Sequence, residues 1–181
     1  KITLFANTRE GGGIRGLTVF LVDADTKGIS IGKEEDKMGI RASATAEIIF
    51  EDCFVPDSAR VGKEGRGFMI AMQTLQMSRP VVAAISVGIA QAAIEAAVAY
   101  SHHRKQFGVK IATFEMVQQM IADMVMKTEA ARILTYKACV AQMNKDKKAG
   151  LYSAMSKCFA SDTAMEVTTT AVQVMGGNGY S

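Results

Sequence analysis

The spacing of hydrophobic residues changes once along the chain, near residue 60. Residues 1–56 contain short runs of β-branched and aromatic residues with partial alternation, which predict strands over 2–6, 17–22, 28–31 and 46–55. From residue 65 onward, apolar residues recur every three or four positions, which predicts helices. The pattern therefore predicts an α+β chain. An antiparallel β-segment over residues 1–60 is followed by an incomplete antiparallel up-down helical bundle over residues 61–181.

The helical part divides into three segments joined by short turns. The first, from Gly65 to about His103, is expected to kink or restart at Pro80, which would point Arg79 into a cavity. Its predicted core face consists of Leu75, Val82, Ile85, Ile89, Ala93 and Ala97. Thr113 is the predicted N-cap of the second helix, whose stripe is Val117, Ile121, Met124, Ala131, Leu134, Ala138 and Ala141. The third helix has the stripe Leu151, Met155, Cys158, Asp162, Met165, Thr169 and Val172. Three such helices leave a place for a fourth.

Composition narrows the possible functions without choosing one. Of 181 residues, 49% are hydrophobic and 22% charged, and the net charge is +3, which is ordinary for a globular protein. The basic group Lys145, Lys147 and Lys148 flanks a turn and favours a solvated loop over a nucleic-acid patch. No apolar run is expected to span a bilayer. Three widely spaced cysteines predict neither a disulfide framework nor a zinc site, and they suit a reducing compartment.

Few residues suggest chemistry on their own. His102 and His103 are adjacent on a helix and point apart, so we expect no metal site. No Ser-His-Asp grouping is evident. Residues 104–108, Arg-Lys-Gln-Phe-Gly, combine cations and an aromatic ring that suit an anionic, planar ligand, or they form a capped helix end. Residues 173–180 present Gly-rich backbone amides to a phosphate or adenine, or they form a helix C-cap.

Taken together, these stretches resemble the acyl-CoA dehydrogenase family of flavoproteins. The strongest signal is a pair of motifs, in which Arg-Lys-x-Phe-Gly is followed about 65 residues later by Gln-x-x-Gly-Gly-x-Gly-Tyr. The matching segments are Gly13 to Val22, Asp36 to Ser43, Phe50 to Asp52, Val55-Pro56, Gly65 to Phe68, Ser78 to Ala84, Arg104 to Gly108 and Gln173 to Tyr180. By resemblance, residues 1–60 are the C-terminal part of a middle β-domain. Residues 61–181 are the first three helices of a C-terminal four-helix-bundle domain.

The resemblance implies an oxidoreductase acting on a CH–CH bond, with FAD as cofactor. It would convert an acyl-CoA thioester to the trans-2-enoyl-CoA in fatty acid β-oxidation. The implied substrate-binding residue is Arg79, and no metal is expected. The implied FAD-binding residues are Arg104, Gln106, Phe107, Phe114, Gln173, Gly176 and Gly177. Also implied are an electron-transferring flavoprotein as electron acceptor, a homotetramer, and a location in the mitochondrial matrix or bacterial cytoplasm.

The catalytic base is expected outside these residues. One family position for it directly precedes the Arg of the Ser78-Arg79 pair, and Ser78 cannot act as the base at neutral pH. The other position would lie beyond residue 181. We therefore expect the chain to be a segment of a longer protein and inactive alone. The alternatives are a non-catalytic scaffold that keeps the fold, an acyl-CoA oxidase, or a plain helical interaction module.

Overall fold

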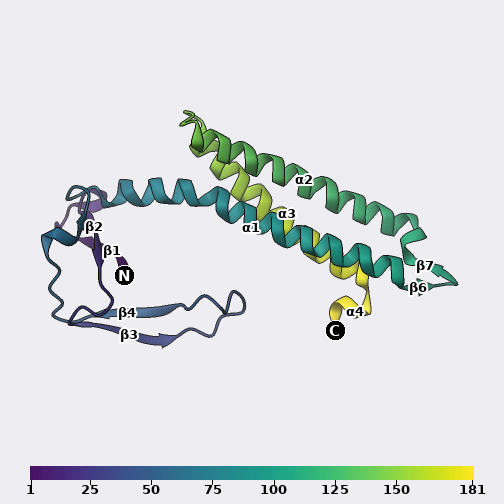
Figure 1. Ribbon diagram of the computed structural model, residues 1–181, viewed down its shortest axis with the longest axis horizontal. Coiled ribbons are helices and arrows are strands. Elements are labelled where there is room, and N and C mark those ends of the chain that lie inside the picture. Colours follow the sequence, from purple (N-terminus) through teal and green to yellow (C-terminus); the bar gives the residue numbers. More distant parts are fainter. The chain divides into compact units, whose positions relative to one another are not determined.

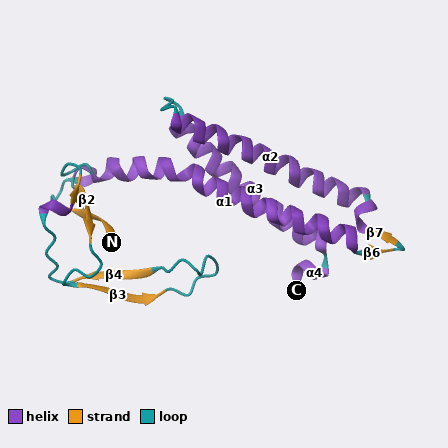
Figure 2. Ribbon diagram, in the orientation of Figure 1, coloured by secondary structure: helices purple, strands orange, loops and turns teal.

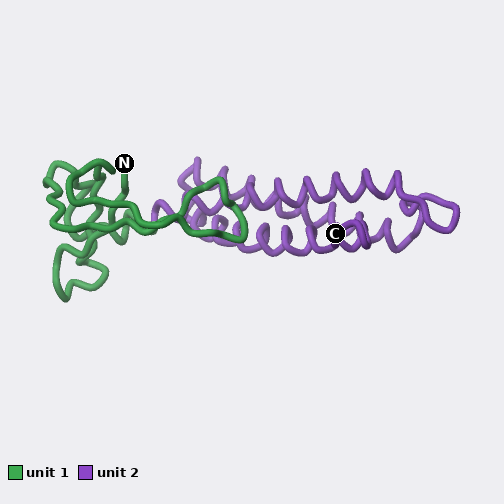
Figure 3. The backbone as a smooth tube through the Cα atoms, turned by 90° about the horizontal axis from the view of Figure 1, so that it is seen from below, with its two compact units in different colours: residues 1–72 green, residues 73–181 purple.

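The computed structural model describes residues 1–181, and the chain forms two compact units (Figure 3). Unit 1 covers Lys1–Met72 and unit 2 covers Gln73–Ser181. Helix α1, Gly67–His103, continues across the point where the units divide. The predicted domain boundary after residue 60 stays a prediction.

Unit 1 consists of antiparallel strands, as predicted (Figure 2). Strands β1 (Ile2–Asn7), β2 (Leu17–Val22) and β5 (Arg60–Val61) form a sheet in the order β1-β2-β5. Strands β3 (Ile29–Glu34) and β4 (Ala46–Phe50) form a separate hairpin. Short 3₁₀ helices, η1 (Gly13–Arg15) and η2 (Asp57–Ala59), lie in the connections. Strand β4 ends earlier than predicted because Asp52 takes a left-handed backbone conformation, with φ +46°.

Unit 2 consists of helices joined by tight connections (Figure 1). After α1 come the two-residue strands β6 (Lys105–Gln106) and β7 (Val109–Lys110), then the 3₁₀ helix η3 (Ile111–Thr113). The remaining helices are α2 (Glu115–Met143), α3 (Ala149–Met175) and the short α4 (Gly177–Tyr180). Helices α2 and α3 run antiparallel (Figure 1). The predicted fold class is therefore confirmed.

Small side chains form the core of unit 2, and this overturns two predicted core faces. In α1 the buried residues are Ala83, Val87, Ala90, Ile94 and Ala97, whereas Leu75, Val82, Ile85 and Ile89 are exposed. In α3 the residues facing inward are Ser153, Ser156, Ala160, Thr163, Ala164, Val167, Ala171 and Val174, and the predicted stripe lies on the outside. Helices approach closely only where side chains are small. The helix face with small side chains therefore turns inward, even though the face with large side chains is more hydrophobic.

Three further helix predictions can be compared with the structure. The α2 stripe is confirmed, with Met124, Ala131, Ala138 and Ala141 buried. A restart at Pro80 is wrong, because one helix continues through that residue. The Thr113 cap is also wrong: the N-cap residue is Phe114, and the Thr113 hydroxyl donates instead to the Lys110 carbonyl at 2.7 Å.

The α1 helix also corrects the expectation that no run could span a bilayer. Its 37 residues include an 18-residue window of mean hydropathy 1.9, so it qualifies by length and composition. Core helices of soluble proteins pass the same test, although only 28% of this window is buried within the chain. A helix that is apolar on several sides needs neighbours on several sides.

Candidate functional site

The segment after α1 forms a miniature hairpin with an unusual turn. The Arg104 N–H donates to the Tyr100 carbonyl at 2.9 Å, and β6 then pairs with β7. The two turn residues, Phe107 and Gly108, have φ values of +53° and +83°. Two positive φ values characterise the type I′ turn, which favours Asn-Gly. A phenylalanine at the first of these positions is strained, and strain of this kind tends to occur at functional sites.

The Phe107 ring lies almost entirely in solvent, with 95% of the residue exposed. Its only aromatic neighbour is Phe114, which lies edge-on with ring centroids 6.4 Å apart. Phe114 is half-buried at the start of α2. The hairpin therefore presents a large aromatic ring that is exposed apart from its edge contact with Phe114.

The end of α3 presents bare backbone. Gly176 ends the helix with φ +59°, as expected of a C-terminal glycine, and its N–H donates to the Gln173 carbonyl at 3.2 Å. Gly177 differs, because it has no left-handed φ and a Cβ added there would meet no atom within 4 Å. Nothing in this chain requires a glycine at position 177. An exposed amide without a side chain suits the close approach of a ligand.

These two segments meet around one cavity of about 280 Å³. Its lining is Tyr100, Arg104, Gln106, Ile111, Val174, Met175, Gly176, Gly177 and Asn178. Four predicted cofactor residues are thus brought together, whereas Phe107, Phe114 and Gln173 lie outside the lining. The Arg104 guanidinium makes no ion pair or hydrogen bond within the chain. An unpaired cation beside bare amides can bind a phosphate group.

Arg79 lies apart from this cavity. It is half-buried on α1, directly before Pro80, and has no ion-pair partner in the chain. The neighbouring Ser78 hydroxyl donates to the Leu75 carbonyl at 3.2 Å. Neither residue belongs to the lining of the cavity at Arg104 and Gly177.

A second basic site, in unit 1, was not predicted. A cavity of about 590 Å³ is lined by Arg9, Arg15 and Arg66, with Glu64, Gly65 and the apolar Ile14, Phe68 and Met69. None of the three arginines forms an ion pair. An arginine cluster beside apolar side chains suits a ligand with several negative charges and an apolar part.

Two glycines position this arginine cluster. A Cβ on Gly65 would lie 2.5 Å from the Arg15 carbonyl oxygen, and one on Gly67 would lie 2.7 Å from that of Leu17. The Gly65 N–H also donates to the hydroxyl of the fully buried Thr18 at 3.0 Å. Only glycines allow this close approach, which brings Arg66 to the same cavity as Arg15. The Gly-Arg-Gly sequence was therefore the feature from which this arginine cluster could have been predicted.

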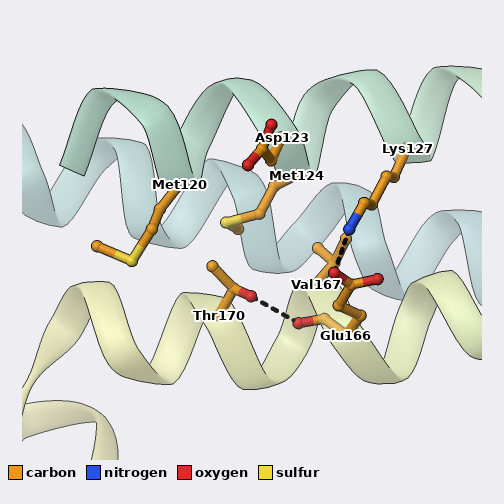
Figure 4. A pocket seen from close by; sticks show the side chains of 7 residues that line it. All are labelled: Met120, Asp123, Met124, Lys127, Glu166, Val167 and Thr170. Atoms are coloured by element: carbon orange, nitrogen blue, oxygen red, sulfur yellow. Dashed lines mark hydrogen bonds and ion pairs between the residues drawn. The ribbon is translucent and has the colours of Figure 1, made fainter. Parts of the chain in front are cut away.

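A third, smaller cavity of about 130 Å³ lies between α2 and α3 (Figure 4). Lys127 and Glu166 form an ion pair across it, and the Met120 and Met124 side chains lie beside it (Figure 4). The Thr170 hydroxyl donates to the Glu166 carbonyl at 2.9 Å, which bonds the helix to itself. Lys127, Glu166 and Thr170 are paired within the chain, and the Asp123 carboxylate is the one polar side chain of the lining without a partner. A lone carboxylate does not suit a phosphate group, so this cavity is not the candidate site.

Comparison with known proteins identifies the family. The model of the acyl-CoA dehydrogenase C-terminal domain matches residues 65–181, and that of the middle domain matches residues 1–53. The chain belongs to the acyl-CoA dehydrogenase family. It is 48% identical over 179 residues to the probable acyl-CoA dehydrogenase FadE25 of Mycobacterium tuberculosis, covering 99% of this chain and 46% of that protein.

Solved structures agree with this assignment. Butyryl-CoA dehydrogenase from Megasphaera elsdenii superposes with a TM-score of 0.96 at 46% identity, covering 99% of this chain and 46% of that one. A chain solved in work on the electron transferring flavoprotein of Acidaminococcus fermentans gives a TM-score of 0.95 at 51% identity. The match covers 99% of this chain and 47% of that one. The chain therefore spans about half the length of the curated relatives it matches.

Proposed function

We propose that these residues are part of an enzyme that oxidises an acyl-CoA thioester to the trans-2-enoyl-CoA with FAD as cofactor. The family is flavin-dependent, and the relatives named above include acyl-CoA and butyryl-CoA dehydrogenases. The observation that carries the proposal is the cavity of about 280 Å³ where Arg104 and Gln106 meet Gly176 and Gly177. A guanidinium without a partner and backbone without side chains fit the phosphates of a dinucleotide.

The residues of this cavity would bind and orient the cofactor. Arg104 pairs with a phosphate oxygen, and Gly177 allows close approach of the cofactor's adenosine diphosphate part. Phe107, exposed on its strained turn, stacks on the cofactor from outside the cavity. Because its ring packs against so little of its own chain, the cofactor it contacts belongs to a neighbouring subunit of a homotetramer.

The arginine cluster of unit 1 would bind the charged end of acyl-CoA. Coenzyme A carries several phosphate charges, and Arg9, Arg15 and Arg66 supply three cations that form no ion pair, against the single carboxylate of Glu64 in the same lining. Ile14 and Phe68 add apolar contacts. Arg79 of unit 2, half-buried and without an ion-pair partner, would line the acyl-CoA site by family resemblance.

The chemistry then needs one group from beyond these residues. FAD, when bound, supplies the acceptor for the β-hydrogen and its two electrons. The α-proton passes to a carboxylate outside residues 1–181, since the Ser78 hydroxyl is not a base at neutral pH. The electrons would leave through an electron-transferring flavoprotein.

Gly177→Ala in the full-length enzyme tests the cofactor assignment. The added methyl group meets no atom of this chain, so the thermal stability of the apoprotein should change little. The affinity for FAD should fall about tenfold or more, as expected if a close backbone contact worth about 1.4 kcal/mol is lost. Fluorescence titration of apoprotein with FAD measures this, and loss of the bound flavin's visible colour with butyryl-CoA measures the reaction.

Gly88→Ala is the matched control, because a Cβ at Gly88 also meets open space but lies far along α1 from the cavity. It should bind FAD as the unmodified enzyme does. If Gly177→Ala also binds FAD normally, the cofactor does not approach this turn. If a flavin-loaded enzyme keeps its colour with acyl-CoA substrates of every chain length, the proposed reaction is wrong.

A further inference from the structure

The cavity of the arginine cluster contains a methionine whose sulfur contacts one of the arginines. The Arg66 guanidinium donates a hydrogen bond from Nη1 to the Sδ atom of Met69 at 3.0 Å. A thioether is a weak acceptor, so this contact leaves the guanidinium largely available to an anion. Both residues line the cavity of about 590 Å³ that also contains Arg9 and Arg15. The contact therefore lies inside the candidate binding site of unit 1.

The backbone holds Arg66 and Met69 at this separation. Arg66 directly precedes α1, and its carbonyl accepts the first helical hydrogen bond, from the Ile70 N–H at 3.2 Å. Met69 lies three residues further along, in the first turn of the helix, and residues at this spacing are neighbours on a helix surface. Gly65 and Gly67, which flank Arg66, pack so closely that neither has room for a Cβ. The contact between guanidinium and sulfur therefore does not depend on a loose loop.

The Met69 sulfur is accessible to small oxidants. Met69 is 49% exposed, and exposed methionines are readily oxidised to the sulfoxide. Met38 and Met126 are more exposed, at 100% and 62%, but neither lies beside a cation of this cavity. Oxidation of Met69 differs from oxidation elsewhere because it changes the surroundings of an arginine that can bind a ligand.

We propose that Met69 is an oxidation site, and that its sulfoxide occupies Arg66 and weakens binding of an anionic ligand by the arginine cluster. The proposal rests on the proposed function for the identity of this ligand, the phosphate-bearing end of acyl-CoA. The oxidant is hydrogen peroxide. A lone pair of the thioether attacks one peroxide oxygen, so that the O–O bond breaks and an S–O bond forms. Sulfur loses two electrons, and the proton on the transferred oxygen passes to the departing hydroxide, which leaves as water.

The added oxygen is a much stronger acceptor than the sulfur it replaces. The S–O bond is polar, so its oxygen carries partial negative charge, and a hydrogen bond to it from a guanidinium is charge-assisted. Because Sδ already lies 3.0 Å from Nη1 of Arg66, an oxygen on this sulfur reaches the guanidinium without movement of the backbone. The positive end of the α1 dipole lies at the same turn and also favours the partial negative charge.

Oxidation therefore makes the ligand compete with an acceptor of the chain itself. If the internal pair is formed about nine-tenths of the time, the apparent Kd of the ligand rises about tenfold. Arg9 and Arg15 are untouched, so binding is weakened and not abolished. None of these residues takes part in the proposed proton or electron transfer. The KM for acyl-CoA should therefore rise while kcat stays nearly constant.

Peroxide treatment of the full-length enzyme tests the site. The enzyme is exposed to dilute hydrogen peroxide, which catalase then removes, and peptide mass spectrometry locates the added oxygen. Calorimetric titration with coenzyme A should show a Kd about tenfold higher after treatment. Methionine sulfoxide reductases should restore the original value, whereas a thiol reductant alone, which reverses cysteine oxidation, should not.

Two methionine variants assign the effect to one sulfur. In Met69→Leu the Kd for coenzyme A should be the same before and after peroxide, whatever its starting value. Met126→Leu is the matched control, because Met126 is exposed on α2 and lines no part of this cavity. It should keep the tenfold rise. Met69→Gln carries an amide oxygen in place of the thioether, so it should raise the Kd without any oxidant.

Three results would overturn the proposal. They are an unoxidised Met69 in enzyme whose Met126 has been oxidised, a normal Kd after oxidation of Met69, and a tenfold rise that persists in Met69→Leu. An enzyme that binds coenzyme A but keeps its flavin colour with butyryl-CoA contradicts the proposed reaction alone, and the Kd ratios still decide the role of Met69. An enzyme that binds no coenzyme A before oxidation contradicts the assignment of the arginine cluster, and this proposal with it.

Discussion

Phe107 shows how a single residue can conflict with its own backbone. Its φ of +53° lies in the left-handed region, where asparagine and glycine are favoured and bulky residues are not. Its ring is nevertheless exposed and meets only the edge of Phe114. Such a conformation costs about 1–3 kcal/mol and persists where something else requires the side chain. We attribute that requirement to the proposed cofactor contact.

Phe107→Asn should therefore separate stability from binding. Asn-Gly is the preferred pair for a type I′ turn, so the apoprotein should keep or slightly raise its melting temperature. Loss of the ring contact, worth about 0.5–1.5 kcal/mol, should weaken FAD binding by up to about tenfold. Calorimetry of apoprotein and a flavin titration provide the two readings.

Phe107→Tyr is the control for this turn, since it keeps both the strain and the ring. It should match the unmodified enzyme in both measurements. Unchanged FAD affinity in Phe107→Asn would show that the exposed ring has no part in cofactor binding.

At the scale of residues, two motifs of the sequence singled out side chains that the fold places together, and their role in cofactor binding stays a prediction. Arg104 with Gln106, and Gly176 with Gly177, were paired by motif alone, and the fold brings them to one cavity. Tyr100 at the same cavity gave no signal, because it looks like any other residue of a long helix. The arginine cluster of unit 1 was missed for a related reason. Its members are distant in sequence and meet only because Gly65 and Gly67 permit close packing.

At the level of elements, periodicity located the helices correctly but assigned two of their faces wrongly. Helices α1 and α3 each have two regular stripes, one small and one large, and the larger stripe was taken as the core. Hydrophobicity ranks Ile85 above Ala83, yet Ala83 is fully buried and Ile85 is 58% exposed. A single sequence shows which faces are apolar. It does not show which of them is covered within the unit and which by other partners.

The tight helix contact can be tested on α2 with two adjacent alanines. Ala131 is 1% exposed and belongs to the cluster with Ala83, Val87 and Ala160, whereas Ala130 is exposed. Ala131→Leu should overpack this cluster and cost about 1–3 kcal/mol in the free energy of unfolding. Ala130→Leu adds the same atoms outside the core, and its effect should stay within about 0.5 kcal/mol.

Urea unfolding of the two full-length variants measures the difference. The comparison controls for helix propensity, because both changes are Ala to Leu in the middle of one helix. Equal stability of the two variants would mean that the helices are not closely packed at Ala131.

At the scale of the whole molecule, the chain leaves apolar surface uncovered on each of its long helices. Val82 and Ile89 on α1, Ile133 on α2 and Met165 on α3 are between 42% and 70% exposed. The α1 stripe also explains why that helix is apolar enough to pass a membrane-span test. A helical bundle that lacks further helices, as the sequence predicted, would have such faces, and so would a subunit of an assembly.

Residues 1–181, produced alone, should therefore behave differently from the same residues within the full-length protein. Uncovered faces of this extent favour association, so the isolated chain should bind a hydrophobic dye strongly and sediment as a broad distribution. It should neither retain FAD nor oxidise butyryl-CoA, because the proposed base and part of the proposed flavin site lie elsewhere. Replacing Val82, Ile85 and Ile89 together by polar residues should reduce dye binding by the isolated chain. In the full-length protein, where we expect these faces to be covered, the same replacement should lower stability. If it is neutral in both settings, the α1 stripe faces solvent in the native protein and nothing covers it.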